Sequence, residues 1–204
     1  MGNGKVFFTS DTHFNHEKML RGVGWEGGCQ RPFRSVEDMN DALVSNWNNW
    51  VGVDDTVYHL GDFCMGKRDA IPEILPRLQG RIVLVAGNHD YKRDDKYFFE
   101  AGHSVERKGL DIELEASGRS WAIHMRHQPY NLTPGEHVDF CLCGHVHERW
   151  RTQFAGAAVE EYRRGDRVKN PAFTAKTDIC NVGVDQWNYA PVTIEEILLV
   201  LERR

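Results

Sequence analysis

The sequence RIVLVAGNHD, residues 81–90, decides the fold class of this chain. Its apolar, β-branched run is typical of a buried strand, and it ends through glycine in three polar residues, Asn88, His89 and Asp90. Polar side chains at the end of a buried strand need partners, because burying them alone costs free energy. The stretch therefore predicts a strand whose carboxyl end faces a functional site.

The rest of the first half repeats this alternation of strand and helix. Residues 5–10 and 56–63 are further predicted strands, and residues 35–51 have the spacing of an amphipathic helix with Ser35 as its N-cap. Residues 68–80 predict a shorter helix, which two prolines interrupt. Such alternation indicates an α/β fold with functional residues at the carboxyl ends of its strands.

The second half of the chain is richer in short β-like segments. They occupy residues 110–116, 119–125, 139–144 and 180–185, before a last helix that Thr193 opens with Glu196 as its capping-box partner. Residues 148–178 carry a local excess of arginine and lysine. That excess fits either a solvated loop and helix or a surface that faces the substrate.

Composition limits the class of protein. The 204 residues, 41% hydrophobic and 27% charged, are enough for one sizeable core, so we expect a single domain over residues 1–204. A net charge of -5 gives no global basic field for long nucleic acid, and no stretch is apolar for long enough to span a membrane. Five cysteines do not form a disulfide framework, which favours a reducing compartment and a cytoplasmic location. Nothing in the sequence indicates an oligomeric state.

Four polar clusters stand at the ends of the predicted strands: SDTHF (10–14), LGDF (60–63), AGNHD (86–90) and CGHVH (143–147). Residues two apart in an extended segment point the same way, so Asp11 with His13, and His145 with His147, can each present a pair of ligands to one point. Carboxylate with imidazole suits Mn, Fe or Zn, whereas Ca and Mg prefer oxygen throughout. One such pair alone is more often a satisfied polar group, but four clusters together favour a metal site.

A single Cys2His2 zinc site in CLCGHVH is an alternative for the last cluster. It would use Cys141 and Cys143 with the two histidines that follow, and it would leave the other three clusters unexplained. Two buried strand cysteines are the better interpretation.

The motifs DTHFNH (11–16), GD (61–62), GNHD (87–90), GHVH (144–147) and NVGVDQWNYAPV (181–192) resemble, in order and approximate spacing, those of the calcineurin-like metallophosphoesterase superfamily. The chain looks most similar to its small bacterial and phage-type phosphoesterases, from about residue 5 to the last helix. The resemblance implies an αββα fold, in which two mixed β-sheets pack as a sandwich with helices on the outer faces.

The resemblance also implies two divalent metal ions. Their ligands would be Asp11, His13 and His147 for the first ion, Asn88 and His145 for the second, and Asp62 as the bridge between them. Physical chemistry agrees, because two cations about 3.5–4 Å apart need a shared anion to offset their repulsion. The neutral amide of Asn88 would limit the negative charge of the site. Manganese is the favoured ion, and Fe, Zn or Ni also suit these nitrogen and oxygen donors.

The second ion of the family takes one more histidine, from a His-x-Pro arrangement. The segment WAIHMRHQPY offers His124 and His127, and only His127 matches that arrangement. In an extended strand the two would face opposite sides. We expect His127 to be the ligand, with His124 as the alternative.

The family pattern gives His89 the role of a proton donor or phosphate-binding group, with Asp90 to orient it. Hydroxide formed at the two ions would attack phosphorus in line, and His89 would stabilise or protonate the leaving oxygen. His16 and Arg31 are predicted substrate contacts from their place near the first cluster and their similarity to the subfamily. Trp187 and Tyr189 fit packing better than stacking on a substrate.

The predicted function is metal-dependent hydrolysis of a phosphodiester or phosphomonoester. A protein Ser/Thr phosphatase would carry G-D-x-V-D-R-G, where this chain has GDFCMGK. The non-enzyme alternative is a catalytically weak scaffold that keeps the fold and binds partners. The partner implied is a phosphate-ester substrate, and cyclic or short nucleotides remain among the candidates.

Overall fold

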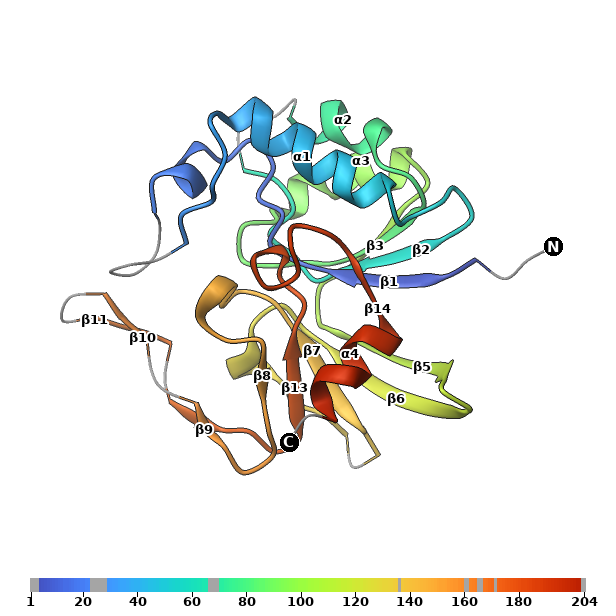
Figure 1. Ribbon diagram of the computed structural model, residues 1–204, viewed down its shortest axis with the longest axis vertical. Coiled ribbons are helices and arrows are strands. Elements are labelled where there is room, and N and C mark those ends of the chain that lie inside the picture. Colours follow the sequence, from blue (N-terminus) through green and yellow to red (C-terminus); the bar gives the residue numbers. More distant parts are fainter. Residues whose placement is uncertain are drawn as a thin grey trace.

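The first of two large β-sheets is mixed, with five strands (Figure 1). Its order is β14 (Val192–Thr193), β1 (Val6–Thr9), β2 (Thr56–His59), β3 (Arg81–Val85) and β4 (Ser104–Glu106). Strands β1 to β4 run parallel, and β14 pairs antiparallel with β1. The computed structural model describes residues 4–22, 29–65, 70–135, 137–159, 162–164, 167–170 and 172–202.

The second sheet is also mixed. Its order is β5 (Leu110–Ala116), β6 (Arg119–Met125), β7 (Phe140–Cys143), β13 (Asp178–Asn181) and β8 (Thr152–Gln153). The central pairs β6–β7 and β7–β13 are parallel, and the outer pairs are antiparallel. The central strands of both sheets are therefore parallel, which gathers their carboxyl ends at one edge of each sheet.

The two sheets pack face to face through a common apolar core. Phe8, Leu60 and Val85 come from the first sheet or the residue after its strand, and Met125 and Leu142 come from the second sheet. All five are at most 1% exposed. The α/β sandwich predicted from the sequence is confirmed.

Three helices cover the outer face of the first sheet, as Figure 1 shows: α1 (Val36–Asn48), α2 (Ala70–Ile74) and α3 (Asp95–Glu100). The predicted N-cap of α1 is present, because Asp38 N–H donates to Ser35 Oγ at 3.1 Å. Trp47 of α1 is buried in the same cluster as Val57 and Ile82 of the sheet.

The last helix, α4 (Ile194–Leu201), has the predicted capping box between Thr193 and Glu196. Its apolar side adds Ile197 and Leu198 to the core between the sheets. This helix contacts β1, β13 and β14, so it fills one side of the sandwich.

The outer face of the second sheet has a different cover. Cys141 and Ile179 pack there against Ala175, Leu132 and Phe173. Within the described residues, this cover consists of coil, the 3-10 turn Pro129–Asn131, and β9 (Ala158–Val159) paired with β12 (Phe173–Thr174). Helices therefore lie outside the first sheet, and short strands lie outside the second.

The basic segment 148–178 differs from the loop and helix considered for it. It contains β8, β9, β12 and the ribbon of β10 (Tyr162–Arg164) and β11 (Arg167–Asn170). The helical turn of its described residues is the 3-10 turn His147–Arg149. Further 3-10 turns span Glu17–Leu20, Leu75–Arg77, Lys92–Asp94 and Val184–Gln186.

The carboxyl ends of the two sheets are joined to each other. Ser10, which follows β1, forms an isolated parallel bridge with Gly183, which follows β13. The Val184 N–H donates to Ser10 O at 3.0 Å, and the His145 N–H donates to Asp11 Oδ2 at 2.9 Å. The polar clusters of both sheets consequently meet at this edge. Among the described helices, none is long and apolar enough to cross a membrane.

Candidate metal centre

Sharp turns follow the strands at this edge, and they place several polar side chains in a left-handed backbone conformation. The residues with positive φ include Asp11 (56°), His13 (47°), Asp62 (56°), His145 (73°) and His147 (47°). Such values are uncommon outside glycine and cost free energy, so they persist where surrounding contacts determine them. All five are predicted metal ligands.

Two glycines allow these turns to approach each other closely. A Cβ on Gly87 would overlap the Asp62 carboxylate, and a Cβ on Gly144 would overlap Ser10 Oγ and Asp11 Oδ2. The glycines of GNHD and GHVH are therefore needed for the contact between neighbouring turns.

The first group of donors consists of Asp11, His13 and His147. His13 Nε2 lies 4.0 Å and His147 Nε2 lies 3.8 Å from Asp11 Oδ1. The two imidazole rings are stacked with their centroids 5.2 Å apart. One donor atom from each residue lies within 4.8 Å of the others.

The second group consists of Asp62, His127 and His145, with Asn88 beside them. His127 Nε2 lies 3.3 Å from Asp62 Oδ2, 3.1 Å from Asn88 Oδ1 and 3.2 Å from His145 Nδ1. The other nitrogen, His127 Nδ1, is 2.7 Å from the Leu60 carbonyl. That carbonyl can only accept, so Nδ1 donates to it, and Nε2 is the nitrogen that faces the group and could bind an ion.

Asp62 lies between the two groups. Its Oδ2 is 3.3 Å from His127 Nε2 of the second group and 3.6 Å from His13 Nε2 of the first. Its Oδ1 accepts a hydrogen bond from the His89 N–H at 2.9 Å. One carboxylate oxygen therefore faces donors of both groups.

The contacts of His13 and His147 with the carboxylates fit shared metal ions better than hydrogen bonds. Separations of 3.6 Å, 3.8 Å and 4.0 Å between imidazole nitrogen and carboxylate oxygen are too long for hydrogen bonds. Two ligands that each lie about 2.1 Å from one ion are at most about 4.2 Å apart, so these separations suit a shared ion. The mixture of carboxylate, imidazole and amide oxygen suits transition metals.

The electrostatics of the centre also call for positive charge. Burial raises the pKa of Asp11, and this outweighs His147 and His127, which lower it, while the nearby Asp62 adds to the rise. Burial alone would lower the pKa of His127, but Asp62 outweighs burial and raises that pKa to about 10. Burial lowers the pKa of His13 well below its ordinary value. Burial thus opposes the charges of both Asp11 and His13, and a cation bound between the two buried carboxylates would stabilise them.

The carboxylate of Asp90, which was predicted to orient His89, binds backbone N–H groups instead. Its carboxylate accepts hydrogen bonds from the N–H groups of Asp62 at 2.7 Å, Gly87 at 2.8 Å and Phe63 at 3.0 Å. It therefore fixes the turn that carries Asp62 and does not orient the ring of His89. We describe Asp90 as a positioning residue.

His89 and His16 lie at the rim of the centre, next to His13. The His89 side chain is 39% exposed, its Nε2 is 4.0 Å from Asp62 Oδ2, and its ring lies 5.7 Å from the ring of His13. The His16 ring is 5.2 Å from the ring of His13, and burial lowers the pKa of His16 to about 4. Both rings can therefore meet a substrate bound at the centre.

Arg31 is not placed as a substrate contact. Its side chain is fully buried, and Nε and Nη2 donate to the two carboxylate oxygens of Asp185 at 2.8 Å and 3.1 Å. Nη1 and Nη2 also donate to the carbonyls of Thr12 and Asp11 at 2.7 Å and 2.6 Å. Arg31 thus supports the turn that carries Asp11 and His13.

Asp185 is the residue of the centre that sequence reasoning missed. Its Oδ2 accepts from His147 Nδ1 at 2.8 Å, which directs His147 Nε2 toward Asp11. Burial alone would raise the pKa of Asp185, but Arg31 outweighs it and holds the pKa well below its ordinary range. The NVGVD motif (181–185) could have indicated it, because Asp185 is the last residue of that motif.

A third donor group joins Cys29 to His147 and Asp185. Burial raises the pKa of the Cys29 thiol, and Asp185 is already bound to Arg31. This group is therefore a poor metal site.

His124 lies away from both donor groups. Its Nδ1 is 2.5 Å from Asp111 Oδ1 on the neighbouring strand β5, so the structure brings His127 and not His124 into the centre. Trp187 and Tyr189 pack into the two main apolar clusters, as expected for packing residues.

A model of the calcineurin-like phosphoesterase family matches residues 4–149. The chain belongs to this family. That range contains every predicted metal ligand and ends before Asp185. The family acts as hydrolases on phosphate-ester bonds, and its members generally bind two divalent metals.

Three relatives extend the similarity to nearly the whole chain. The uncharacterized protein MJ1445 of Methanocaldococcus jannaschii is 32% identical over 205 residues, which cover 100% of this chain and 94% of that protein. The Gene 66 protein of Mycobacterium phage L5 is 32% identical, covering 89% and 87%. The Gene 66 protein of phage D29 is 26% identical, covering 90% and 89%. The phage relatives agree with the predicted small bacterial and phage type.

A solved structure of similar fold is that of AQ665 from Aquifex aeolicus, a protein of unknown function. It superposes with a TM-score of 0.60 at 23% identity, covering 97% of this chain and 100% of that one. This likeness supports the fold.

Gly144→Ala tests the close approach of the two turns. The added methyl overlaps Ser10 Oγ and Asp11 Oδ2, so we expect the free energy of unfolding in denaturant to fall by about 1–3 kcal/mol. Gly135→Ala is the matched control, because a Cβ there meets nothing within 4 Å. Equal stability of the two variants would contradict the packing described.

Proposed function

We propose that this protein hydrolyses a phosphate ester with two divalent transition-metal ions held on either side of Asp62. The observation that supports the proposal is the position of Asp62 Oδ2, which is 3.3 Å from His127 Nε2 and 3.6 Å from His13 Nε2. A carboxylate that faces two donor groups at once can offset the repulsion between two cations. The membership of the family supports the same activity.

The ligands of the proposed centre are those expected from the sequence. Asp11, His13 and His147 would hold the first ion, Asn88, His127 and His145 the second, and Asp62 both. When bound, the two ions would supply Lewis acidity and an activated water near neutral pH. Manganese is the favoured ion, since nitrogen and oxygen donors are mixed, and Fe, Zn and Ni suit the same donors.

His89 is the proposed catalytic group of the chain itself. Its backbone N–H is bound to Asp62 Oδ1, which ties it to the bridge, while its ring stays partly exposed at the rim. A ring in that position can donate a proton or a hydrogen bond to the leaving oxygen of a substrate. His16, whose ring lies 5.2 Å from the His13 ring, is the proposed substrate contact.

Metal titration tests the proposed ligand set without relying on activity. We expect calorimetry of metal-free wild-type protein with Mn²⁺ to resolve two binding events. His127→Ala removes a ligand and should weaken one binding event by more than about tenfold. Even the loss of a residue that only hydrogen-bonds to a metal ligand lowers metal affinity by about 10–100-fold.

His124→Ala is the matched control for that titration, since His124 is bound to Asp111 and lies outside the centre. It should keep both binding events. Unchanged binding by His127→Ala, or an equal loss in both variants, would contradict the ligand set.

Hydrolysis of p-nitrophenyl phosphate and bis-p-nitrophenyl phosphate tests the activity itself. We expect metal-stripped wild type to regain activity with Mn²⁺, and Asp62→Ala to remain at the level of the metal-free protein. His89→Ala should lower kcat by about 100-fold or more if it acts as a general acid. His137→Ala, an exposed histidine, is the control and should match wild type.

The ratio of diester to monoester hydrolysis would separate the two substrate classes. A wild type that binds two ions and hydrolyses neither ester would favour the scaffold alternative instead.

A further inference from the structure

A cavity of about 180 Å³ lies directly beside the second donor group. Asn88 and His127 form one part of its wall, so it is continuous with the centre. Three small residues, Ala86, Gly87 and Gly109, form another part of its lining. A single buried water needs about 10–15 Å³ of such space, so the cavity has room for a group the size of a phosphate.

The charges on the wall of this cavity are positive. Arg107 and Arg126 line it, and no Asp or Glu is among the described residues that line it. The chain as a whole has a net charge of -5, so the charge on this wall is opposite in sign to the net charge of the protein. The cavity is therefore suited to an anion.

The two arginines differ in how they are bound. Arg107 donates from Nε to Asp95 Oδ2 at 2.9 Å and from Nη1 to the Asp90 carbonyl at 3.1 Å, so its charge is already paired. Arg126 is half-buried, and among the described residues its guanidinium has no hydrogen-bond or ion-pair partner. A partly desolvated arginine without a partner is ready to bind an anionic group from solution.

Two amides complete the wall. Asn131 Nδ2 donates to Gln128 Oε1 at 2.6 Å, and Gln128 Nε2 lies 3.4 Å from Asn88 Oδ1. These contacts hold the Gln128 amide next to Asn88 and add neutral hydrogen-bonding groups to the lining of the cavity.

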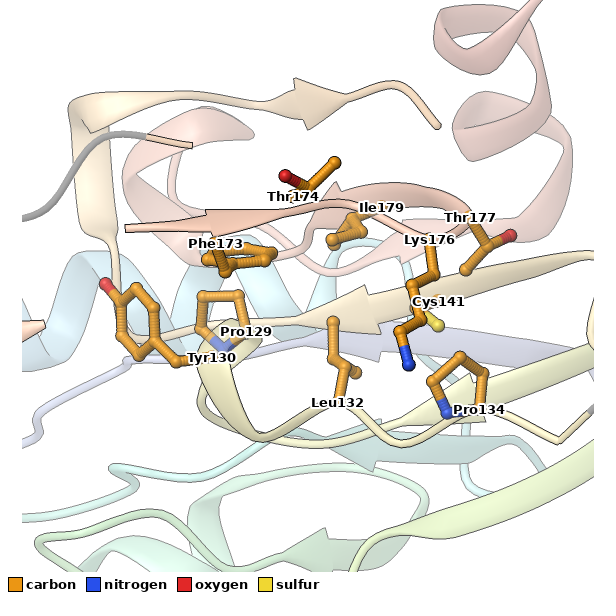
Figure 2. Close-up of a pocket in the computed structure, with 10 residues that line it drawn as sticks. All are labelled: Pro129, Tyr130, Leu132, Pro134, Cys141, Phe173, Thr174, Lys176, Thr177 and Ile179. Carbon is orange, nitrogen blue, oxygen red and sulfur yellow. The ribbon is translucent and has the colours of Figure 1, made fainter. Parts of the chain in front are cut away.

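The cavity in Figure 2 is of another kind. It measures about 160 Å³ and lies on the outer face of the second sheet, where the figure shows Tyr130, Pro129 and Phe173 along one wall. The Tyr130 ring also contacts the His145 ring, with centroids 5.8 Å apart. Its lining is mostly apolar and carries one cation among the described residues, Lys176, where the cavity beside Asn88 and His127 has two arginines.

We propose that the cavity next to Asn88 and His127 binds a second phosphate of the substrate, with Arg126 as the residue that selects for it. The proposal rests on the proposed function and narrows its substrate class to small phosphate esters that carry a second phosphate group. The scissile phosphate lies at the metal centre, and the second one accepts hydrogen bonds from the Arg126 guanidinium.

Binding of non-hydrolysable probes tests the role of Arg126. With Mn²⁺ present, calorimetry would compare methylphosphonate with bisphosphonates that have one, two or three carbons between their phosphorus atoms. We expect wild type to bind the best bisphosphonate at least about tenfold more tightly than methylphosphonate, as one charge-assisted contact allows. Arg126→Gln should abolish this preference, and Arg126→Lys should retain part of it.

Arg81→Gln is the matched control, because it removes the same positive charge. Arg81 is exposed and begins β3, whereas the cavity lies at the other end of that strand. It should show the wild-type preference. Equal affinities of wild type for both kinds of probe, or an unchanged preference in Arg126→Gln, would overturn the role of the cavity alone. Wild type that binds neither probe would overturn the proposed function together with it.

Discussion

The structure depends on the burial of one carboxylate, Asp62, where the two sheets meet. Its side chain is 3% exposed, and its turn is held by two hydrogen bonds, from the Asp62 and Phe63 N–H groups to the Asp90 carboxylate, which also accepts from the Gly87 N–H. A buried carboxylate is costly unless it is paired, and here the partners come from both sheets: His13 beyond β1 and His127 beyond β6. The position of each turn is thereby set by the others.

This constraint connects the fold to the proposed chemistry. Left-handed backbone at Asp11, Asp62 and His145 stores free energy that the sandwich core and the Asp90 and Arg31 contacts must offset. Ions bound between the turns would add to that compensation, so binding metal would also stabilise the folded state. The positions of the side chains are fixed before a substrate arrives, which is the condition for efficient electrostatic catalysis.

Much of this centre could be predicted from the sequence, because parallel strands bring their carboxyl ends together and the polar clusters follow those ends. The alternation argument was incomplete, however. Strand alternation alone would let His145 and His147 face one point, whereas the family resemblance gave them to different ions, and they lie in different donor groups after turns at positive φ. The Arg31–Asp185 pair joins residues 154 positions apart, and the carboxylate of Asp90 caps backbone groups. Neither contact has a local pattern, so three-dimensional structure was needed to find them.

Anomalous X-ray scattering from crystals grown with Mn²⁺ is the most direct test of the central claim that Asp62 is shared by two ions. The account predicts two peaks at the manganese edge, about 3.5–4 Å apart, with Asp62 between them. One group of ligands around the first peak would be Asp11, His13 and His147, and the other would be Asn88, His127 and His145. A single peak, or a peak beside Cys29 and Asp185, would contradict the account.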